Sequence, residues 1–343
     1  MNICHINLAK EFRGGERQTY LLMKGLAALN IDQTLICRQN SPLAEQAHTI
    51  DRLNVREINK PFIFRTREAK HCDLLHAHEG RSCHFAYINW VTTKTPYLIT
   101  RRIPNLPKKS FPTTHVYKKA TKVVALSQAI KSNLIDYQTD MQLEIIPSMR
   151  SDLTSNADTI NELKNRYAGK TIVGNIGALV KHHKGQQYII EAAKVLQKSH
   201  PNLHFLILGK GNDENELREQ TNGLSNIEFV GFVNNVGDYL SIFDLFLFPS
   251  LEEGLGSILL DVMQFNVPII ASNVDGIPDI ISHNKNGLLV EPKNSHEIVN
   301  AITRLIDDSE LAKSLSNQAL KTVEDYTVDK ISKLYLDLYH SIL

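Results

Sequence analysis

The chain has 343 residues, the length of two ordinary domains, and its apolar content is sufficient for two cores. No apolar run approaches the ~18 to 20 residues of a membrane-spanning helix, and the N-terminus lacks the basic and then apolar order of a secretory signal. The net charge of +1 hides an asymmetry, because residues 1–150 hold 22 Lys/Arg and 12 Asp/Glu whereas the remainder holds 16 and 25.

Strand and helix patterns alternate through the first half of the chain. We expect an amphipathic helix over residues 16–29 and strands at 3–8, 33–37, 73–77, 97–100, 122–126 and 143–146. Strands separated by helical stretches form βαβ units and hence a parallel sheet. The first half is therefore predicted to be a Rossmann-like domain. Its four cysteines lack CxxC spacing, which favours buried free thiols in a reducing cytoplasm over a disulfide or a zinc site.

The first loop after a strand carries two glycines, Gly14 and Gly15, directly before a helix. This arrangement gives a tight turn and a helix N-terminus that can hold an anion. The GxGxxG fingerprint of dinucleotide-binding domains is absent, which argues against a nicotinamide enzyme. A glycine turn without any ligand explains the pair almost as well.

Two further strand exits in this half carry polar residues. His76 and His78 share one face if the strand extends that far, but a zinc site would need further ligands, so we expect His78 to line a cleft as a polar side chain. Arg101 and Arg102 follow the strand at 97–100, and two fixed positive charges suit an anionic group of a ligand. The alternative for this pair is a basic surface turn.

A polar stretch over residues 147–160 predicts a linker to a second domain. We expect strands at 171–176, 203–208, 227–230 and 244–248, and a helix over 187–197. A further helix opens at Ser257, residues 286–290 suggest a hairpin-like turn, helical periodicity fills 297–325, and a final helix covers 327–343.

The stretch from 250 to 272 is the main candidate for a ligand site. A short apolar strand ends at Pro249, and Glu252, Glu253 and two glycines occupy its carboxyl end before a helix that carries Asp261. In open α/β sheets ligands bind at the carboxyl ends of strands. A loop acid and a helix acid can then hold two different parts of one extended ligand. The alternative is that both are solvated charges.

The order of residues from Glu253 to Pro268 resembles the signature of glycosyltransferase family 4, retaining enzymes of the GT-B fold. The pattern is acid, glycine, apolar residue, glycine, a second acid eight residues after the first, and then a strand led by proline. The resemblance implies that Glu253 contacts the transferred sugar and that Asp261, one methylene shorter than the usual Glu, holds the ribose. Lys184 and Gly185 match a second loop of the family, whose diphosphate-binding Arg is here Ala178.

The same resemblance implies a set of site residues and a domain plan. Lys184 and Glu253 would be catalytic, and the donor would contact Gly14, Gly15, Ala178, Gly209, Phe232, Leu255, Gly256, Ser257 and Asp261 as well. The acceptor or cleft residues would be Arg17, His78, Arg81, Arg101 and Arg102. Residues 1–155 and 156–326 would form two Rossmann-like domains that face an interdomain cleft, and the helix 327–343 would cross back onto the first.

We therefore expect a retaining hexosyltransferase that moves a sugar from a nucleoside diphosphate sugar to a saccharide or lipid-linked acceptor in envelope glycan synthesis of the lipopolysaccharide type. The chain has no Asp-x-Asp motif, which predicts a transferase without a metal or other cofactor. The basic first half suits an anionic membrane surface better than a nucleic acid, and it is equally explained by a solvated surface. The alternatives are a GT-B epimerase or phosphorylase, and a catalytically silent subunit that binds sugar nucleotides.

Overall fold

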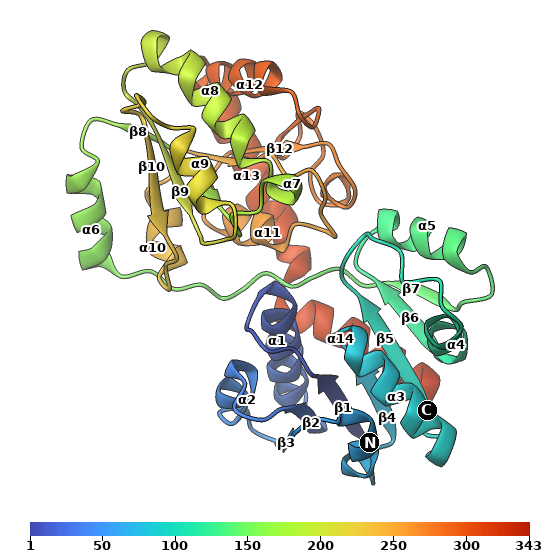
Figure 1. The fold of residues 1–343 in the computed structure, drawn as a ribbon. Coiled ribbons are helices and arrows are strands. Elements are labelled where there is room, and N and C mark those ends of the chain that lie inside the picture. The colour runs from blue at the N-terminus through green and yellow to red at the C-terminus, as the bar shows by residue number, and fades with distance from the viewer. The chain divides into compact units, whose positions relative to one another are not determined.

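The structure is a computed structural model that describes residues 1–343. The chain forms two compact units. Unit 1 consists of Met1–Met149 together with Asp325–Leu343, and unit 2 consists of Arg150–Glu324 (Figure 1). The chain thus passes between the units at 149/150 and 324/325, where the sequence places the boundaries at 155/156 and 326/327. None of the helices is both long and apolar enough to span a bilayer.

Unit 1 contains a seven-stranded, fully parallel sheet with the order β3-β2-β1-β4-β5-β6-β7. The strands are β1 (Asn2–Asn7), β2 (Asp32–Arg38), β3 (Leu53–Ile58), β4 (Leu74–Ala77), β5 (Tyr97–Arg101), β6 (Lys122–Ala125) and β7 (Leu143–Ile145). The inner strands are buried on both faces, which explains their continuous apolar runs. The Rossmann-like prediction for this half is confirmed.

The helices of unit 1 cover both faces of this sheet. They are α1 (Gly14–Ala28), α2 (Pro42–Ala47), α3 (Gly80–Thr93), α4 (Phe111–Lys119), α5 (Gln128–Tyr137) and α14 (Val328–Ile342), with a 3-10 segment η1 (Phe62–Ala69). Their first turns follow ordinary capping chemistry, since Ser127 begins α5 by accepting the Ile130 N–H and Thr327 begins α14 by accepting the Lys330 N–H.

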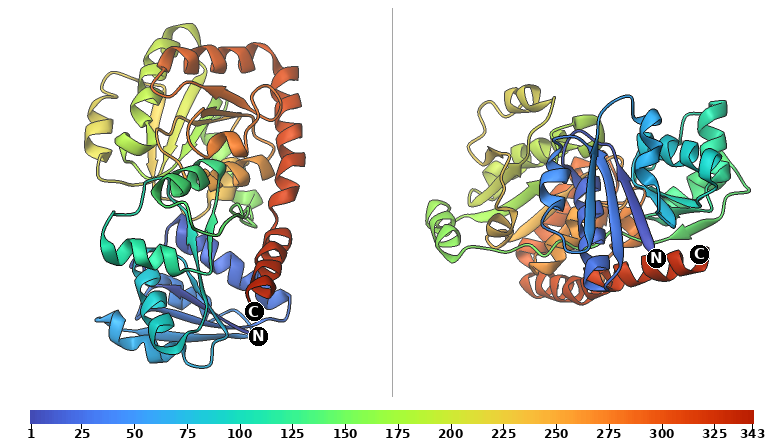
Figure 2. Two further views of the ribbon diagram at one scale, coloured as in Figure 1. Left: turned by 90° about the vertical axis from the view of Figure 1, so that its right-hand side faces the viewer. Right: turned by 90° about the horizontal axis from the view of Figure 1, so that it is seen from below.

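The C-terminal helix α14 belongs to unit 1, as expected, and lies beside α1 (Figure 2). Its buried face carries Ile331, Tyr335 and Tyr339, which join the core formed by the inner faces of α1 and the sheet. Gly25 of α1 allows the two helices to approach closely, because a Cβ atom there would lie 2.0 Å from the Ser332 Oγ. The end of the chain therefore completes the core of its beginning.

Unit 2 contains a six-stranded parallel sheet with the order β10-β9-β8-β11-β12-β13. The strands are β8 (Thr171–Ile176), β9 (Leu203–Leu208), β10 (Ile227–Gly231), β11 (Leu245–Phe248), β12 (Ile269–Ser272) and β13 (Leu288–Val290). The hairpin-like turn predicted for residues 286–290 is wrong. Residues 284–286 do form a turn, but it leads into β13, which pairs in parallel with β12.

The helices of unit 2 surround this second sheet. They are α6 (Ala157–Arg166), α7 (Lys181–Lys184), α8 (Gln186–Ser199), α9 (Glu214–Glu219), α10 (Val236–Leu240), α11 (Ser257–Gln264), α12 (Ser295–Asp307) and α13 (Ser309–Thr322), with 3-10 segments η2 (Ile277–Asp279) and η3 (Val323–Tyr326). The polar stretch expected to reach residue 160 ends at Asn156, whose side chain caps α6 by accepting the Asp158 and Thr159 N–H groups. Arg150 and Glu324 join the two ends of unit 2 by a 3.1 Å ion pair.

Candidate functional site

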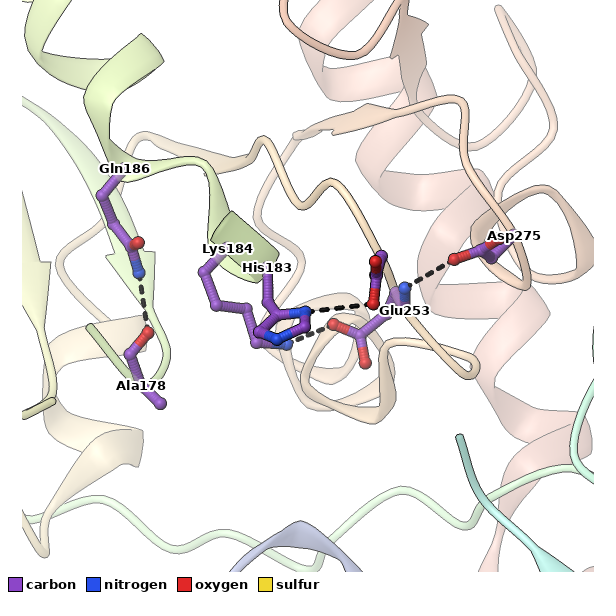
Figure 3. A network of polar contacts seen from close by, with 7 residues as sticks. Ala178, His183, Lys184, Gln186, Glu253 and Asp275 are labelled. Atoms are coloured by element: carbon purple, nitrogen blue, oxygen red, sulfur yellow. Dashed lines mark hydrogen bonds and ion pairs between the residues drawn. The ribbon is translucent and has the colours of Figure 1, made fainter. Parts of the chain in front are cut away.

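An ion pair between Lys184 and Glu253 lies at the carboxyl end of the unit 2 sheet (Figure 3). The lysine ends the short helix α7 after β8, and the glutamate lies in the loop between β11 and α11. Because β8 and β11 are neighbours in the sheet, their exits bring two residues together that are 69 positions apart. Both side chains keep part of their surface exposed, so a ligand can reach the pair.

A glycine next to the lysine sets this geometry. Gly185 has φ +65°, and a Cβ atom there would lie 2.1 Å from the Pro249 carbonyl oxygen. Only glycine lets the end of α7 lie so close to the end of β11 without strain. The Lys184 Nζ also lies 5.5 Å from the centre of the Phe248 ring, on the last residue of β11. The ammonium group is therefore held over the carboxyl end of β11.

The main chain of Glu253 is fixed by the turn that follows β12. Its N–H donates to the Asp275 carboxylate at 2.9 Å (Figure 3). Its carbonyl accepts the Gly276 N–H at 3.2 Å. Asp275 itself has φ +46°, a conformation that side chains other than glycine rarely adopt. The preceding acid points elsewhere, since Glu252 contacts the His183 Nδ1 at 3.0 Å.

The loop then turns into α11 through Leu255, Gly256 and Ser257. Gly256 is the N-cap with φ +83°, Leu255 is buried, and Ser257 begins the helix. The first N–H groups of a helix have no partner within it and carry partial positive charge. The turn thus offers hydrogen-bond donors beside the Lys184–Glu253 pair, as expected for a site that binds an anion.

Asp261, the expected ribose ligand, lies on α11 with only 4% of its surface exposed. Its carboxylate accepts the N–H of Ser151 at 2.6 Å. The acid therefore ties α11 to the chain segment that enters unit 2. This bond was not anticipated from the sequence.

The loop before Lys184 provides no second cation that faces Glu253. Ala178 is exposed, and its carbonyl accepts the side-chain amide of Gln186 at 2.9 Å (Figure 3). Lys181, the nearest lysine, is paired with Glu216 of α9, and its N–H donates to Asp213 at 2.8 Å. Lys184 is therefore the cation of this loop that faces Glu253.

Gly209 and Phe232 lie at the exits of β9 and β10, beyond the loop of Ala178. Gly209 packs on the backbone of Gly177, because a Cβ atom there would lie 1.9 Å from the Gly177 carbonyl oxygen. Phe232 exposes 65% of its surface. An exposed aromatic ring at a strand exit is free to stack on a planar ligand.

In unit 1 the expected residues gather at the exits of β1, β4 and β5. Gly14 and Gly15 form the first turn of α1, which also carries Arg17. Arg81 lies exposed in the first turn of α3, where its N–H donates to the Glu79 carboxylate at 2.8 Å. This carboxylate also accepts the Leu8 N–H at 3.3 Å, so it links the exits of β1 and β4.

The prediction that His78 lines a cleft is wrong, because 4% of its surface is exposed. Its Nε2 lies 3.0 Å from the His5 Nδ1, and its ring lies 3.8 Å from that of His76, centre to centre. Burial lowers the pKa of all three histidines, that of His5 to about 3. The three rings are thus neutral parts of the core.

These histidines bring their nitrogens within 4.8 Å of one another, which is a spacing that metal sites share. Most of the remaining nitrogens are already used, since His76 contacts the hydroxyls of Tyr339 and Thr100 at 2.7 Å and His5 contacts Gln33 at 3.1 Å, whereas the buried His78 Nδ1 has no partner. Burial is the main cause of the lowered pKa of His76 and His78, and the positive charge of Arg102 is a smaller cause in the same direction. Polar contacts within the core account for this cluster better than a cation does.

The two arginines after β5 have different surroundings. The Arg101 guanidinium donates to the Asn105 carbonyl and contacts the Tyr117 hydroxyl at 3.5 Å. Arg102 has no hydrogen bond or ion pair to the protein, and its Nε is buried although the residue as a whole is partly exposed. Burial lowers the pKa of Arg102. Only the second arginine is therefore available to a ligand.

Sequence reasoning missed Asp275 and His183, which hold the loop of Glu253. The Asp275–Gly276 dipeptide signals a turn, and that signal could have suggested a residue with positive φ at this place. Nothing in the sequence reveals that the turn after β12 contacts the loop after β11. His183 stands next to Lys184, and its carbonyl accepts the Leu251 N–H at 2.8 Å.

Two models of known protein families match this chain, one in each of its two units. A family model described as "Glycosyl transferases group 1" matches residues 156–322, and one described as "Glycosyltransferase Family 4" matches residues 12–149. A protein of Haemophilus influenzae described as an uncharacterized glycosyltransferase is 31% identical over 175 residues, which cover 49% of this chain and 49% of that protein. The match thus spans about half the length of that relative.

Two further proteins match nearly the whole chain. The UDP-Gal:alpha-D-GlcNAc-diphosphoundecaprenol alpha-1,3-galactosyltransferase of Escherichia coli is 25% identical, and the match covers 98% of this chain and 97% of that protein. The crystal structure of Anabaena HepE in complex with UDP-glucose matches with a TM-score of 0.87 at 19% identity, covering 99% of this chain and 100% of that chain. At this identity the structural match demonstrates a shared fold.

Proposed function

Because this chain belongs to glycosyltransferase family 4 and has the GT-B fold, we propose that it is a retaining hexosyltransferase whose donor is a nucleoside diphosphate sugar. The acceptor in this proposal is a hydroxyl group of a saccharide or of a lipid-linked saccharide. The observation that carries the proposal is the Lys184–Glu253 pair beside the N-terminus of α11. A cation, a carboxylate and free N–H groups meet there at the carboxyl ends of parallel strands.

The pair suggests how the donor is received. Without a donor the ammonium group of Lys184 neutralises the carboxylate of Glu253. A diphosphate carries more negative charge, so it competes for the lysine and for the N–H groups that begin α11. Glu253 is then free to accept hydrogen bonds from hydroxyls of the sugar. Lys184 stabilises the charge that develops on the diphosphate as the glycosidic bond breaks.

The remaining donor contacts extend from this centre along the strand exits. Phe232 would stack on the base near Gly209, and Asp261 would contact the ribose. Because no acidic metal motif is present in the chain, we propose that the diphosphate is stabilised without a divalent cation. Activity should survive EDTA, and restoration of lost activity by magnesium or manganese would contradict this part.

A screen for the donor is the experiment that tests the function. The thermal shift of the protein is measured against a panel of nucleotide sugars, because a ligand at ~100 times its dissociation constant stabilises a protein by ~2.7 kcal/mol. Transfer or slow hydrolysis of the sugar that binds should follow. Proton NMR of the product should show the anomeric configuration of the donor, and an inverted product would exclude retention. Binding without release of nucleoside diphosphate under any condition would leave only a binding subunit.

We place the acceptor in envelope glycan synthesis of the lipopolysaccharide type. The Escherichia coli relative that aligns along the whole chain acts, by its name, on a diphosphoundecaprenol-linked sugar. A lipid-linked acceptor also suits a protein that associates with the cytoplasmic face of a membrane. Ile103, Leu106 and Phe111 expose 53%, 47% and 76% of their surface, and Lys108 and Lys109 lie exposed between them. Apolar and basic side chains together favour the surface of an anionic bilayer.

Co-sedimentation with vesicles tests this association. Binding to anionic vesicles at low salt should weaken when Lys108 and Lys109 are replaced by Gln, and it should fade by a few hundred millimolar salt because the Debye length is then below ~8 Å. The double replacement Lys194→Gln and Lys198→Gln removes the same charge from an exposed face of α8 and is the control. Equal sedimentation with neutral and anionic lipid would remove the membrane from the proposal.

A further inference from the structure

The polar stretch that leads from unit 1 into unit 2 is held to the protein over much of its length. Met149 and Ser151 are buried, and the backbone of each is hydrogen-bonded to the side chain of a helix. Farther along, a Cβ atom on Gly237 would lie 2.2 Å from the Thr154 carbonyl oxygen, so the stretch packs directly on α10. A flexible linker runs over the surface and makes few such contacts.

Gln18 of α1 binds Met149 at both polar groups of its backbone. The side-chain amide of Gln18 donates to the Met149 carbonyl, its oxygen accepts the Met149 N–H, and both distances are 2.8 Å. An amide side chain carries a donor and an acceptor side by side, so Gln18 makes the pair of bonds that a neighbouring strand would make. It thereby fixes the last residue of unit 1 before the chain leaves this unit.

Two residues later the chain is held in unit 2. The Ser151 N–H donates to the Asp261 carboxylate of α11 at 2.6 Å, and a hydrogen bond to an ionised acceptor is stronger than one between neutral groups. Arg150 forms its 3.1 Å ion pair with Glu324, at the other place where the chain passes between the units. Residues 149–151, called the crossing segment below, are therefore each held by a different part of the protein.

These contacts leave few bonds about which the backbone can rotate at this crossing. Between the two helix contacts the soft dihedral angles are ψ of Met149, both angles of Arg150 and φ of Ser151. Hinges in proteins are a few residues of this kind, which absorb the change in φ and ψ when domains move. The side chain of Gln18 determines where such a hinge begins, because without it the residues before Met149 could bend as well.

We propose that Gln18 is a positioning residue for sugar transfer, because it fixes the unit 1 end of the crossing segment and confines rotation there to Met149 and Arg150. The inference rests on the proposed function, in which Lys184 and Glu253 of unit 2 hold the donor while the residues expected to receive the acceptor belong to unit 1. Reacting atoms must come within about 3 to 3.5 Å of one another. Loss of the Gln18 contacts should therefore slow transfer and leave donor binding unchanged.

Pulsed electron paramagnetic resonance tests this role without any turnover. Spin labels on Gln46→Cys of α2 and Lys198→Cys of α8 occupy one exposed position in each unit, and the four native cysteines are buried. Gln18→Leu should broaden the distribution of distances between the labels. Gln33→Leu is the matched control and should not broaden it, because Gln33 is also buried but its amide contacts lie wholly within unit 1.

An insertion keeps the test decisive if Gln18→Leu does not fold. A glycine inserted between Met149 and Arg150 leaves the contacts on either side in place and adds the φ and ψ angles of one unrestricted residue. It should broaden the distance distribution as well. A glycine inserted after Gly223, in an exposed turn of unit 2, is the control and should leave the distribution unchanged.

Kinetic measurements separate positioning from stability. Gln18→Leu should lower kcat by up to about 10²-fold while the thermal shift caused by the donor stays the same, whereas Gln33→Leu should lower the melting temperature without that loss of kcat. Equal distributions for these two variants, an unchanged distribution after the insertion at 149/150, or a lost donor shift in Gln18→Leu would overturn the proposal. Absence of sugar transfer by the wild type would contradict the proposed function alone, since the distance distributions need no turnover.

Discussion

At the scale of single residues, the site depends on one loop acid whose main chain and side chain are held by different partners. The turn after β12 holds the Glu253 backbone through Asp275, and Lys184 neutralises its carboxylate. The backbone contact can therefore be altered without removing the carboxylate. Substitutions of Glu253 and of Asp275 should therefore affect turnover in different ways.

Replacement of Glu253 by Ala should abolish transfer with little change in melting temperature. The carboxylate orients the sugar in the proposed mechanism, and the loss of such a positioning group costs about 10²-fold or more in rate. Glu252→Ala is the matched control, because this acid contacts His183 and exposes 44% of its side chain. Near-normal turnover of the Glu253 variant would remove this residue from the mechanism, whatever the control does.

Replacement of Asp275 by Gly should lower kcat while the protein stays at least as stable. Glycine relieves the backbone at φ +46° but removes the acceptor of the Glu253 N–H. Asp275→Asn keeps an acceptor oxygen and should retain more activity than the glycine variant. If both variants show unchanged kcat and a raised KM for the donor, Asp275 contributes to binding and not to the position of Glu253.

The candidate residues could be predicted from the sequence, but their contacts could not. Lys184 and Glu253 each stand out in a motif, whereas their pairing depends on β8 and β11 being neighbours in the sheet. In the sequence His78 is an ordinary histidine after a strand, and only the fold shows that β1 brings His5 beside it. The sequence likewise shows two equivalent arginines after β5, and only the fold reveals that Arg101 has a partner and Arg102 has none.

At the scale of elements, the strands were predictable because parallel strands buried on both faces have continuous apolar runs. The edge strand β3 was missed, since it is only partly buried and its residues do not form such a run. The strand β13 was mistaken for a turn because the Asn-Gly signal before it is strong over a short segment. The formation of short strands at sheet edges depends on pairing with the neighbouring strand more than on their own residues.

The close approach of α1 and α14 gives a prediction about stability. Gly25→Ala would place a methyl group 2.0 Å from the Ser332 Oγ, so α14 must shift. Overpacking costs about 1 to 3 kcal/mol, against ~1 kcal/mol gained from the helix propensity of alanine. We expect urea denaturation to show a net loss of about 1 kcal/mol that Ser332→Gly partly restores. Gly80→Ala has no atom within 4 Å of the added carbon and should be neutral.

At the scale of the whole molecule, the two units should respond differently to acid. The folded pKa of His5 lies at about 3, below the ordinary 6.5, so its contribution to stability is complete above pH 6.5 and is lost as the pH falls below it. At pH 5 this histidine alone costs about 2 kcal/mol, and His76 and His78 shift in the same direction. All three lie in unit 1.

Fluorescence of Trp90 is the measurement for this prediction. It is the one tryptophan of the chain and lies on α3 of unit 1. Between pH 7.5 and pH 5 the urea midpoint seen by Trp90 should fall further than the midpoint of helix loss seen by circular dichroism, which averages over both units. His48→Gln changes an exposed histidine and is the control. Equal midpoints at both pH values would mean that the buried rings do not govern the stability of unit 1.

Unit 1 is encoded in two pieces, because residues 150–324 stand between its sheet and its last helix. The two chain ends both lie on unit 1, close together in every view (Figures 1 and 2). A circular permutant that begins at Asp325, joins Leu343 to Met1 through a short linker and ends at Glu324 would encode each unit as one uninterrupted segment. Cutting the natural order after Met149 instead should leave a fragment without Tyr335 and Tyr339, whose rings fill the core beside His76. With the permuted order either unit can be produced separately as one segment, and the binding of its ligand can be measured in isolation.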